Sequence, residues 1–333
     1  MAIALKDFPR SAAGSEPVVS VAITCFNSEK WLGRALDSVL VQETEFPVEI
    51  VIADDCSNDA TVAVAKSYRD KYPHLVRVLE RKENVGTQRN YYDAFEECRG
   101  KFVAWLDADD YWTDPEKLAV QVKALDGDPS LTICCHFVRW VMRDGGGEVK
   151  RERFPDLAPG RHGIESILRS NFLPSPSVMF RNGLQRQLPQ WYFDVPPLTD
   201  WPLYVVAARH GDILLLDRVM ADYTLNATSA FWGEGDVFWQ KMNVDFFSRV
   251  ESIIPKKFHR RVRAEKGKRY EAIACSLRQQ GDFIGSRKAA VEAFRSPAAK
   301  DNLGSKVKTL LTSFLRETQW RLRGRKNPLT SSS

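Results

Sequence analysis

Three carboxylates follow one apolar stretch of the chain within four positions. The run FVAWL at 102–106 ends directly before Asp107, Asp109 and Asp110. An apolar run of this length is typical of a strand that is buried on both faces. Neighbouring carboxylates repel one another unless they are solvated or hold a cation, and oxygen ligands of this kind suit Mg²⁺ or Mn²⁺, often together with substrate phosphates. These residues indicate either a metal and phosphate site or a solvated turn between a strand and a helix.

Two further polar segments lie at the ends of predicted elements: one follows an apolar run, and the other opens a helix. EIVIA at 49–53 is followed by Asp54 and Asp55, and the turn at 84–86 opens a helix that carries Arg89. In open α/β sheets, ligands bind beyond the carboxyl ends of the strands. Backbone N–H groups at a helix start favour an anion, to which Arg89 would add positive charge. The alternatives are a turn-forming role, which we prefer for Asp54, and a solvated Arg89.

Strand-like and helix-like segments alternate through the first 145 residues. The predicted strands are 18–25, 49–53, 76–79, 102–106 and 131–141, and the predicted helices include 31–40, 87–98 and 115–125. Alternation with short links predicts a parallel sheet covered by helices, with right-handed crossovers.

The pattern changes beyond residue 151. A helix is predicted at 203–209, and short strands at 213–216 and 219–223. After Trp232 the chain is helical, with a helix hairpin expected from 265–280 and 283–295.

Composition places the chain among ordinary soluble globular proteins. Its net charge of +5 is mild, but basic residues are in excess from Lys300 to the end. The six cysteines form no C-x-x-C pair, the N-terminus lacks the apolar core of a secretory signal, and no stretch approaches the roughly 20 apolar residues of a membrane span. We expect a cytoplasmic protein with reduced thiols and no nucleic-acid partner.

Four segments in order carry a family resemblance. VSVAITCFN, EIVIADDCSNDAT, NVGTQRN and LDADDYW follow one another between residues 19 and 112. Together they resemble glycosyltransferase family 2, densely over 18–145 and more thinly over 174–226. The resemblance implies an α/β GT-A fold (the nucleotide-diphospho-sugar transferase fold), whose mostly parallel sheet is flanked by helices. It also implies a leader at 1–16, a GT-A domain at 17–245 with donor (17–145) and acceptor (146–245) halves, and a helical extension at 246–333.

The implied activity is inverting transfer from a nucleotide sugar, most simply a UDP-sugar. The resemblance implies that Asp109 and Asp110 form the binding site for Mn²⁺ or Mg²⁺, with Asp110 as the direct ligand. It implies that Asp107 contacts the ribose or the metal. A divalent metal would neutralise the charge that develops on the leaving diphosphate. The resemblance places substrate-binding residues at Thr24, Phe26, Asp55, Asn84, Gly86, Arg89, Asp107 and Trp201.

The catalytic base is expected near the acceptor. Inverting transfer needs one carboxylate to take the proton of the acceptor hydroxyl, and Asp200 in PPLTDWPL matches the family position. An ordinary helix N-cap is the alternative for Asp200, and Asp194 is the fallback base. Trp201 either walls the acceptor pocket or fills the core.

One segment departs from the family pattern. Many relatives carry an Arg or Lys and a His after the tyrosine where this chain has Tyr223, Thr224 and Asn226. The missing charges leave Arg89 and the metal to hold the diphosphate, or weaken turnover. The loop 229–236 is a lid over the donor or an ordinary surface loop.

The expected role is assembly of a bacterial surface polysaccharide or glycoconjugate from the cytoplasmic side. The acceptor would be a glycan or a lipid-linked glycan. A basic amphipathic tail over 300–333 either lies peripherally on the inner membrane surface or packs on the domain. The alternatives are a polyprenyl-phosphate sugar synthase and a non-catalytic nucleotide-sugar-binding scaffold.

Overall fold

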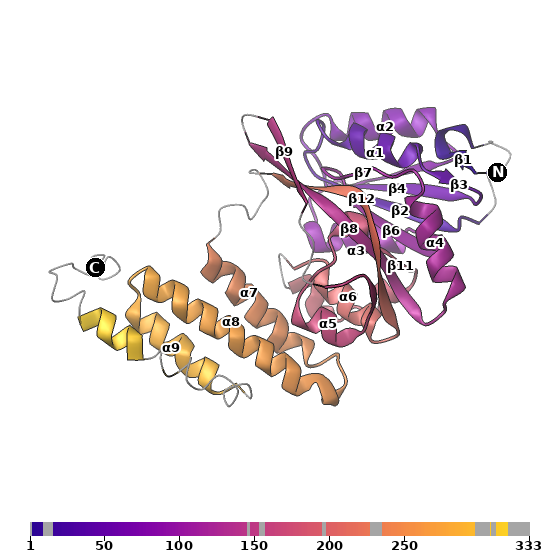
Figure 1. Ribbon diagram of the computed structural model, residues 1–333. Helices are drawn as coiled ribbons and strands as arrows, with labels where there is room; N and C mark the ends of the chain where they lie inside the picture. The colour runs from indigo at the N-terminus through magenta and orange to yellow at the C-terminus, as the bar shows by residue number, and fades with distance from the viewer. Residues whose placement is uncertain are drawn as a thin grey trace. The chain divides into compact units, whose positions relative to one another are not determined.

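The chain forms two compact units, residues 1–232 and 233–333. The computed structural model, shown in Figure 1, describes residues 2–8, 16–144, 147–152, 157–194, 198–226, 235–296, 307 and 311–318. The predicted boundary after residue 245 falls inside helix α7 (Asp236–Val250). The division into donor, acceptor and C-terminal domains stays a prediction.

One mixed sheet forms the centre of the first unit. Its strands follow the order β10-β12-β8-β11-β6-β2-β4-β5, with β7 paired to β12 and β9 to β8. The bounds are β2 Val19–Cys25, β4 Val48–Asp54, β5 Val76–Glu80, β6 Phe102–Asp107, β7 Tyr111–Trp112, β8 Leu131–Asp144, β9 Gly147–Glu152, β10 Gly160–His162, β11 Met179–Arg181 and β12 Asp212–Asn226. Strands β2, β4, β5 and β6 are parallel, as are β8 and β12, and β11 joins the two groups antiparallel to both β6 and β8.

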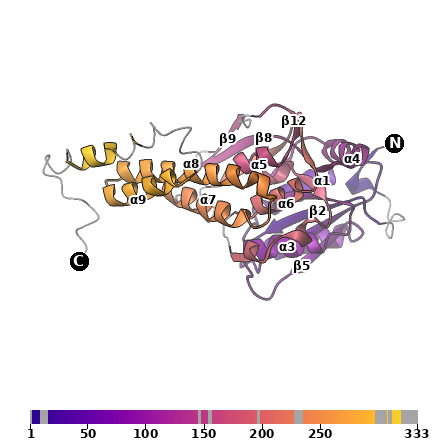
Figure 2. The same cartoon turned by 90° about the horizontal axis from the view of Figure 1, so that it is seen from below.

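Helices cover the sheet (Figures 1 and 2). Helix α3 packs on β2 and β4, α4 packs on β8, and α5 packs against α6. The bounds are α1 Leu32–Leu40, α2 Thr61–Lys71, α3 Thr87–Glu96, α4 Lys117–Gly127, α5 Ile164–Arg169 and α6 Trp201–Ala208, with 3₁₀ turns η1 Leu5–Asp7, η3 Ser175–Ser177, η4 Leu184–Gln187 and η5 Gln190–Asp194. A small sheet pairs β1 (Ile3–Ala4) with β3 (Glu43–Thr44).

The apolar runs behave as predicted. Every residue of β2 and of β4 is buried, as is β6 up to Leu106, which is the pattern of parallel strands covered on both faces. The prediction of two short strands at 213–216 and 219–223 is wrong, because β12 is continuous from Asp212 to Asn226. Register shifts between Leu216 and Ala221 let the strand pass the polar pair Asp217-Arg218 while its pairing with β8 continues.

The second unit is helical. Helix α8 (His259–Gln279) and helix α9 (Phe283–Phe294) form the predicted hairpin, with Gly281 at φ +87° in the link between them. Helix α7 packs against α8, and residues 311–318 are also helical. Across the described segments of both units, no helix has the length and apolarity needed to cross a membrane.

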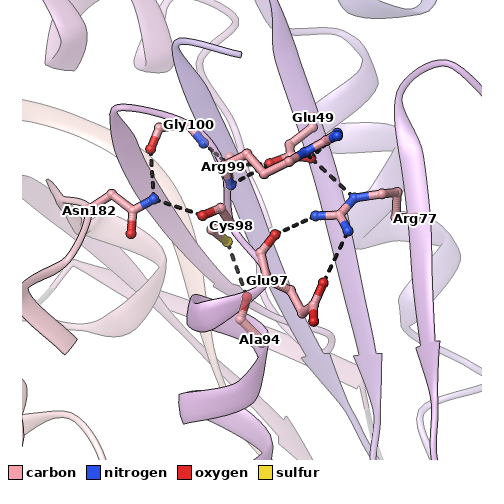
Figure 3. A network of polar contacts seen from close by, with 9 residues as sticks. Glu49, Arg77, Ala94, Glu97, Cys98, Arg99, Gly100 and Asn182 are labelled. Carbon is pink, nitrogen blue, oxygen red and sulfur yellow. Dashed lines mark hydrogen bonds and ion pairs between the residues drawn. The ribbon is translucent and has the colours of Figure 1, made fainter. Parts of the chain in front are cut away.

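A polar network closes the amino-terminal edge of the parallel strands (Figure 3). The buried Glu49 of β4 accepts hydrogen bonds from Ser20 Oγ (2.6 Å), from the Arg99 backbone N–H (2.7 Å) and from Arg99 Nη2 (2.7 Å). Arg77 of β5 donates to it through Nε at 3.2 Å. Burial alone would raise the pKa of Glu49, but the hydrogen bonds from Arg99 and Ser20 outweigh it and lower that pKa. The ionised carboxylate therefore ties β2, β4, β5 and the end of α3 together.

We expect Glu49→Gln to lower the free energy of unfolding by about 1–3 kcal/mol at neutral pH, because it removes the charge that three neighbours bind. A carboxyl whose pKa is lowered in the folded state stabilises the fold at pH values above its ordinary pKa, which is 4.5 here. This stabilisation is lost as the pH falls through the folded-state pKa. Urea unfolding should therefore show the difference between wild type and variant shrinking below about pH 4.5. Glu97→Gln is the control, since that side chain is half exposed; an equal loss in the control would contradict the prediction.

Candidate active site

The predicted carboxylates lie at the carboxyl ends of neighbouring parallel strands. Asp107 ends β6 and is in register with Thr24 near the end of β2, while Asp54 ends β4 in register with Cys25. A turn follows β6, in which the Asp110 N–H donates to the Asp107 carbonyl at 3.0 Å. The edge of the sheet opposite the Glu49 network therefore carries the candidate site.

Asp107 is bonded by side chains from four different segments. Its Oδ1 accepts from Tyr91 OH of α3 at 2.6 Å, from Thr24 Oγ1 of β2 at 3.0 Å and from Trp105 Nε1 of β6 at 3.3 Å. Its Oδ2 accepts from Ser175 Oγ of η3 at 2.7 Å. The carboxylate thus positions the strand end, and Thr24, one of the predicted substrate-binding residues, donates to it.

Tyr91 and Ser175 were not predicted from the sequence. Burial raises the pKa of Tyr91 well above its ordinary value, and the charge of Asp107 adds to the effect. One signal for Tyr91 was present, because Tyr91, Ala94 and Phe95 share a helix face by their spacing and the last two are buried. Ser175 lies in a Pro-rich turn whose sequence gives no sign of its partner.

Asp110 lies deeper in the protein than Asp109. Asp110 is 2% exposed and its Oδ1 accepts the Thr224 backbone N–H at 2.6 Å, so β12 is bonded to the turn after β6. Asp109 is partly exposed. Burial raises the pKa of Tyr223 of β12, and four carboxylates raise it further, in this order: Asp110, Asp200, Asp107 and Asp109. The charges of the predicted metal residues and of the predicted base therefore all contribute to the raised pKa of Tyr223.

These residues fit a divalent cation. Among the described residues, no three or more His, Cys, Asp or Glu side chains are arranged to hold a metal ion by themselves. Mg²⁺-type sites often use only one or two carboxylates, because substrate phosphates and water supply the other ligands. Since Asp107 is bonded by four protein donors, Asp109 and Asp110 are the carboxylates that would hold such an ion.

Asp55 holds the loop ahead of α3. Its Oδ1 accepts the Val85 N–H at 2.8 Å and its Oδ2 accepts the Gly86 N–H at 3.1 Å, while Asn84 Nδ2 donates to the Asp55 carbonyl at 2.9 Å. Gly86 has φ +84°, a conformation that favours glycine. Three predicted residues thus lie together, and their contacts are with one another.

Phe26 and Arg89 lie at the surface of this region. The Phe26 ring is 48% exposed, so one of its faces is available for stacking. Arg89 pairs with Asp93 through Nε at 2.8 Å, and its guanidinium lies within 6 Å of the Tyr92 and Phe193 ring centres. The predicted diphosphate contact of Arg89 therefore requires this side chain to exchange or share its partner.

Asp200 is both an N-cap and a half-buried carboxylate. It caps α6, accepting the Trp201 N–H at 2.7 Å, and its Oδ2 accepts from Asn171 Nδ2 at 2.8 Å. Burial raises the pKa of Asp200, these two hydrogen bonds lower it in part, and the charge of Asp107 raises it again, so that the pKa lies above its ordinary value. Trp201 is 4% exposed and donates to the Ile167 carbonyl at 2.8 Å, which is the core-filling alternative. Asp194, the fallback base, is exposed.

Two cations reach the uncharged segment of β12, one from β8, which pairs with β12, and one from β9, which pairs with β8. Asp222 is fully buried and accepts from Arg139 Nε of β8 at 2.7 Å and from Lys150 Nζ of β9 at 2.9 Å. Lys150 also donates to Tyr111 OH at 3.0 Å, next in sequence to Asp110. Thr224 Oγ1 is buried without a hydrogen-bond partner.

Two further predictions concern single segments. Asp54 forms the local turn that we preferred for it, since Ser57 N–H donates to Asp54 Oδ2 at 2.9 Å. Most of the lid predicted at 229–236 lies outside the described residues; within it, Gly235 is the N-cap of α7.

Comparison with known proteins gives matches over most of the chain. The sequence model of the family described as Glycosyl transferase family 2 matches residues 20–183. The uncharacterized protein Rv1520 of Mycobacterium tuberculosis is 36% identical over 282 residues, which are 82% of this chain and 78% of that protein. The poly(ribitol-phosphate) beta-N-acetylglucosaminyltransferase TarS of Staphylococcus aureus is 38% identical over 96 residues, 28% of this chain and 16% of TarS.

Solved structures share the architecture. Staphylococcus aureus TarS in complex with UDP-GlcNAc superposes with a TM-score of 0.64 at 19% identity, covering 92% of each chain. The mannosyltransferase PcManGT of Pyrobaculum calidifontis, in complex with GDP-Man and Mn²⁺, gives a TM-score of 0.57 at 17% identity, covering 94% of this chain and 89% of that one. At these identities the likeness shows a common fold.

We expect Asp107→Asn to lower the free energy of unfolding by about 2–4 kcal/mol, because an amide nitrogen cannot accept and leaves buried hydroxyl donors unsatisfied. Tyr91→Phe removes one donor and leaves the acceptor in place, so its cost should be only about 1 kcal/mol. Urea unfolding of both variants measures the difference. An Asp107→Asn protein as stable as wild type would show that these bonds do not position the strand end.

Proposed function

Since the chain belongs to glycosyl transferase family 2, has the GT-A fold and is a glycosyltransferase, we propose that it is an inverting, metal-dependent enzyme. It moves a sugar from a UDP-sugar to a hydroxyl of a glycan or lipid-linked glycan in bacterial surface polysaccharide or glycoconjugate assembly. The UDP-GlcNAc bound to the structural relative TarS supports a UDP-sugar as donor. The mycobacterial relative supports a bacterial setting.

One observation carries the proposal: Asp200 is a half-buried carboxylate that caps α6, and burial and the charge of Asp107 at the end of β6 raise its pKa. A general base works best when its pKa lies near the working pH. Burial is the usual way in which a protein raises the pKa of a carboxyl toward that pH. The N-cap bond and the Asn171 bond fix the orientation of Asp200 on a rigid helix end.

The chemical step is a single displacement. Asp200 takes the proton of the acceptor hydroxyl while the oxygen forms a bond to the anomeric carbon of the donor. The bond from that carbon to the diphosphate oxygen breaks, and the nucleoside diphosphate leaves with the electron pair. Attack opposite to the leaving group inverts the anomeric carbon.

The donor is held on the other side of the site. Phe26 presents a face on which the nucleobase stacks, and Asp55 keeps the loop 84–86 in place beside it. Asp109 and Asp110 hold Mn²⁺ or Mg²⁺, which neutralises the charge of the leaving diphosphate when bound. The Mn²⁺ bound to the mannosyltransferase relative supports this choice of metal. Arg139 of β8 and Lys150 of β9 supply positive charge two residues from Thr224, through their ion pairs with Asp222 of β12.

The protein is proposed to work in the cytoplasm. The membrane contact predicted for 300–333 falls largely on residues outside the described part of the chain, and the relatives give no support for it.

We expect calorimetric titration to show UDP binding that requires Mn²⁺ or Mg²⁺, and Asp110→Ala to abolish the metal-dependent part. GDP should bind more weakly than UDP. Asp217→Ala, on the β12 segment where the register shifts, is the matched control and should bind like wild type. Metal-independent UDP binding, unchanged in Asp110→Ala, would contradict the assignment of the metal residues.

The proposed base predicts the acid side of the pH profile. With a UDP-sugar that is turned over, kcat/KM should rise with pH through the raised pKa of Asp200, because only the ionised carboxylate accepts a proton. Asp200→Asn should lower kcat roughly 10²–10⁴-fold and remove this limb. Asn171→Ala keeps the base but removes a hydrogen bond that lowers its pKa, so the limb should move to higher pH. A limb that stays in place in both variants would exclude Asp200 as the base.

A further inference from the structure

The two units carry opposite net charge. Residues 233–333 contain 22 Lys and Arg against 10 Asp and Glu, a net charge of +12, whereas residues 1–232 contain 26 against 33, a net charge of −7. The overall value of +5 hides this contrast. A strongly basic unit attached to an acidic domain is the electrostatic pattern of a binding surface for anions.

More than half of the net charge of residues 233–333, +7, lies in one short segment, and the tail from Lys300 on carries a further +6. Between residues 256 and 269, spanning η6 (Lys256–Phe258) and the first half of α8, there are eight Lys and Arg and one Glu, Glu265. Lys256, Lys257 and Arg260 are exposed, and none makes an ion pair with a described residue. Repulsion among these cations destabilises the unit unless an anion neutralises them.

The cations form a stripe along one side of α8. Arg260, Arg263, Lys266 and Tyr270 follow one another at spacings of three or four residues, which places them on one helix face, and Lys256 precedes them by one turn. At 1.5 Å per residue, the stripe from Arg260 to Tyr270 is about 15 Å long. Such a length suits several negative charges in a row better than a single small anion.

The stripe leads into a groove of about 280 Å³ formed by α7, α8 and α9. Arg263, Lys266 and Tyr270 line it from α8, and Ser296 and Arg295 from the end of α9. Glu251 binds Arg263 at 3.0 and 3.2 Å and Glu292 binds Arg295 at 2.5 Å, so these ion pairs orient the guanidinium groups. Each guanidinium keeps further N–H groups for an anionic oxygen.

The walls of the groove are fixed by close helix packing. At Gly267, a Cβ atom would lie 2.3 Å from Ser296 Oγ, so α8 and α9 approach closely there. Ser296 Oγ in turn donates to the Arg263 carbonyl at 2.9 Å. Val262, Ile273 and Ala274 of α8 are buried, and no large apolar side chain of α8 is exposed. Since an interfacial helix needs an exposed apolar face to enter lipid, this surface suits a charged polymer better than a membrane.

We propose that the Lys256–Tyr270 stripe and its groove bind a polyanionic polymer, a glycan or polyol chain with repeated phosphodiester or carboxylate groups. Because this surface would bind the acceptor of a transferase, the inference rests on the proposed function. The polymer would be retained by the basic unit through many weak contacts while one of its hydroxyl groups reacts. Binding of this kind is strongly salt-dependent, because each contact releases counterions.

The test measures binding of fluorescent inorganic polyphosphate to the full-length protein by anisotropy, with neutral dextran as the uncharged probe. Wild type should bind polyphosphate and not dextran, with affinity falling steeply between about 50 and about 200 mM salt. The triple variant Lys256→Glu, Arg260→Glu and Lys266→Glu should bind at least roughly tenfold more weakly, with a shallower salt slope. It leaves the Arg263 and Arg295 ion pairs in place.

The matched control makes the same change in charge on the first unit: Lys6→Glu, Lys71→Glu and Lys123→Glu, three exposed lysines. It should stay within about threefold of wild type, because it lowers only the long-range charge. The charge-preserving variant Lys256→Arg, Arg260→Lys and Lys266→Arg should also bind like wild type. Equal weakening in the stripe variant and the Lys6 control would overturn the proposal, as would polyphosphate binding no tighter than dextran.

Two further readouts separate the possible failures. Co-sedimentation with vesicles of phosphatidylcholine and phosphatidylglycerol, in the absence of polyphosphate binding, would assign the surface to a membrane and overturn the polymer. UDP titration of the same samples should give equal affinities in all variants. If the wild-type protein does not bind UDP, the proposed transferase function is overturned, while the polyphosphate result still holds.

Discussion

The site depends on one partly buried acceptor, the Asp107 carboxylate. Asp107 satisfies hydroxyl groups from β2, α3 and η3 and the indole of its own strand. A buried hydroxyl without an acceptor is costly, so these segments can pack only around the carboxylate. The turn that follows is thereby fixed, and Asp109 and Asp110 are presented from a rigid strand end. Asp110 then bonds Thr224 and brings the long strand β12 to the same place. The local charge and the global packing are therefore set by the same four residues, 107–110.

Much of the fold could be predicted because parallel strands are covered on both faces. Their apolar runs are continuous, and β2, β4 and β6 lie within a residue or so of the predicted ranges. The antiparallel strand β11 could not be predicted, since MFR is three residues long and is stabilised by pairing with β6 and β8. In β12, the polar pair Asp217-Arg218 resembles a turn in sequence, but pairing with β8 carries the strand past it. Long-range pairing decided both cases, and a local pattern contains no information about it.

The sequence predicted the carboxylates of the site but not the residues that donate hydrogen bonds to them. Asp107, Asp110 and Asp200 stand at element ends, where sequence patterns are most informative. Tyr91, Ser175 and Asn171 contact them from segments 16, 68 and 29 positions away, and serine or asparagine in a loop has many possible roles. The family resemblance named Thr24 and Asp55 as donor contacts, yet their present partners are Asp107 and the loop 84–86. A single sequence does not distinguish a residue that shapes a pocket from a residue that contacts the ligand in it.

The Glu49 network and the Asp107 network lie at opposite ends of the same strands. Ser20 joins one and Thr24 the other, four residues apart on β2, a separation of about 13 Å along the strand. Substitutions that far apart with no common partner have additive effects on stability. Evolution can therefore remodel the end that carries the candidate site, accepting destabilising changes in exchange for new specificity, while the Glu49 end keeps the domain folded. Separation along the strand gives this enzyme robustness toward mutation and with it the capacity to diversify.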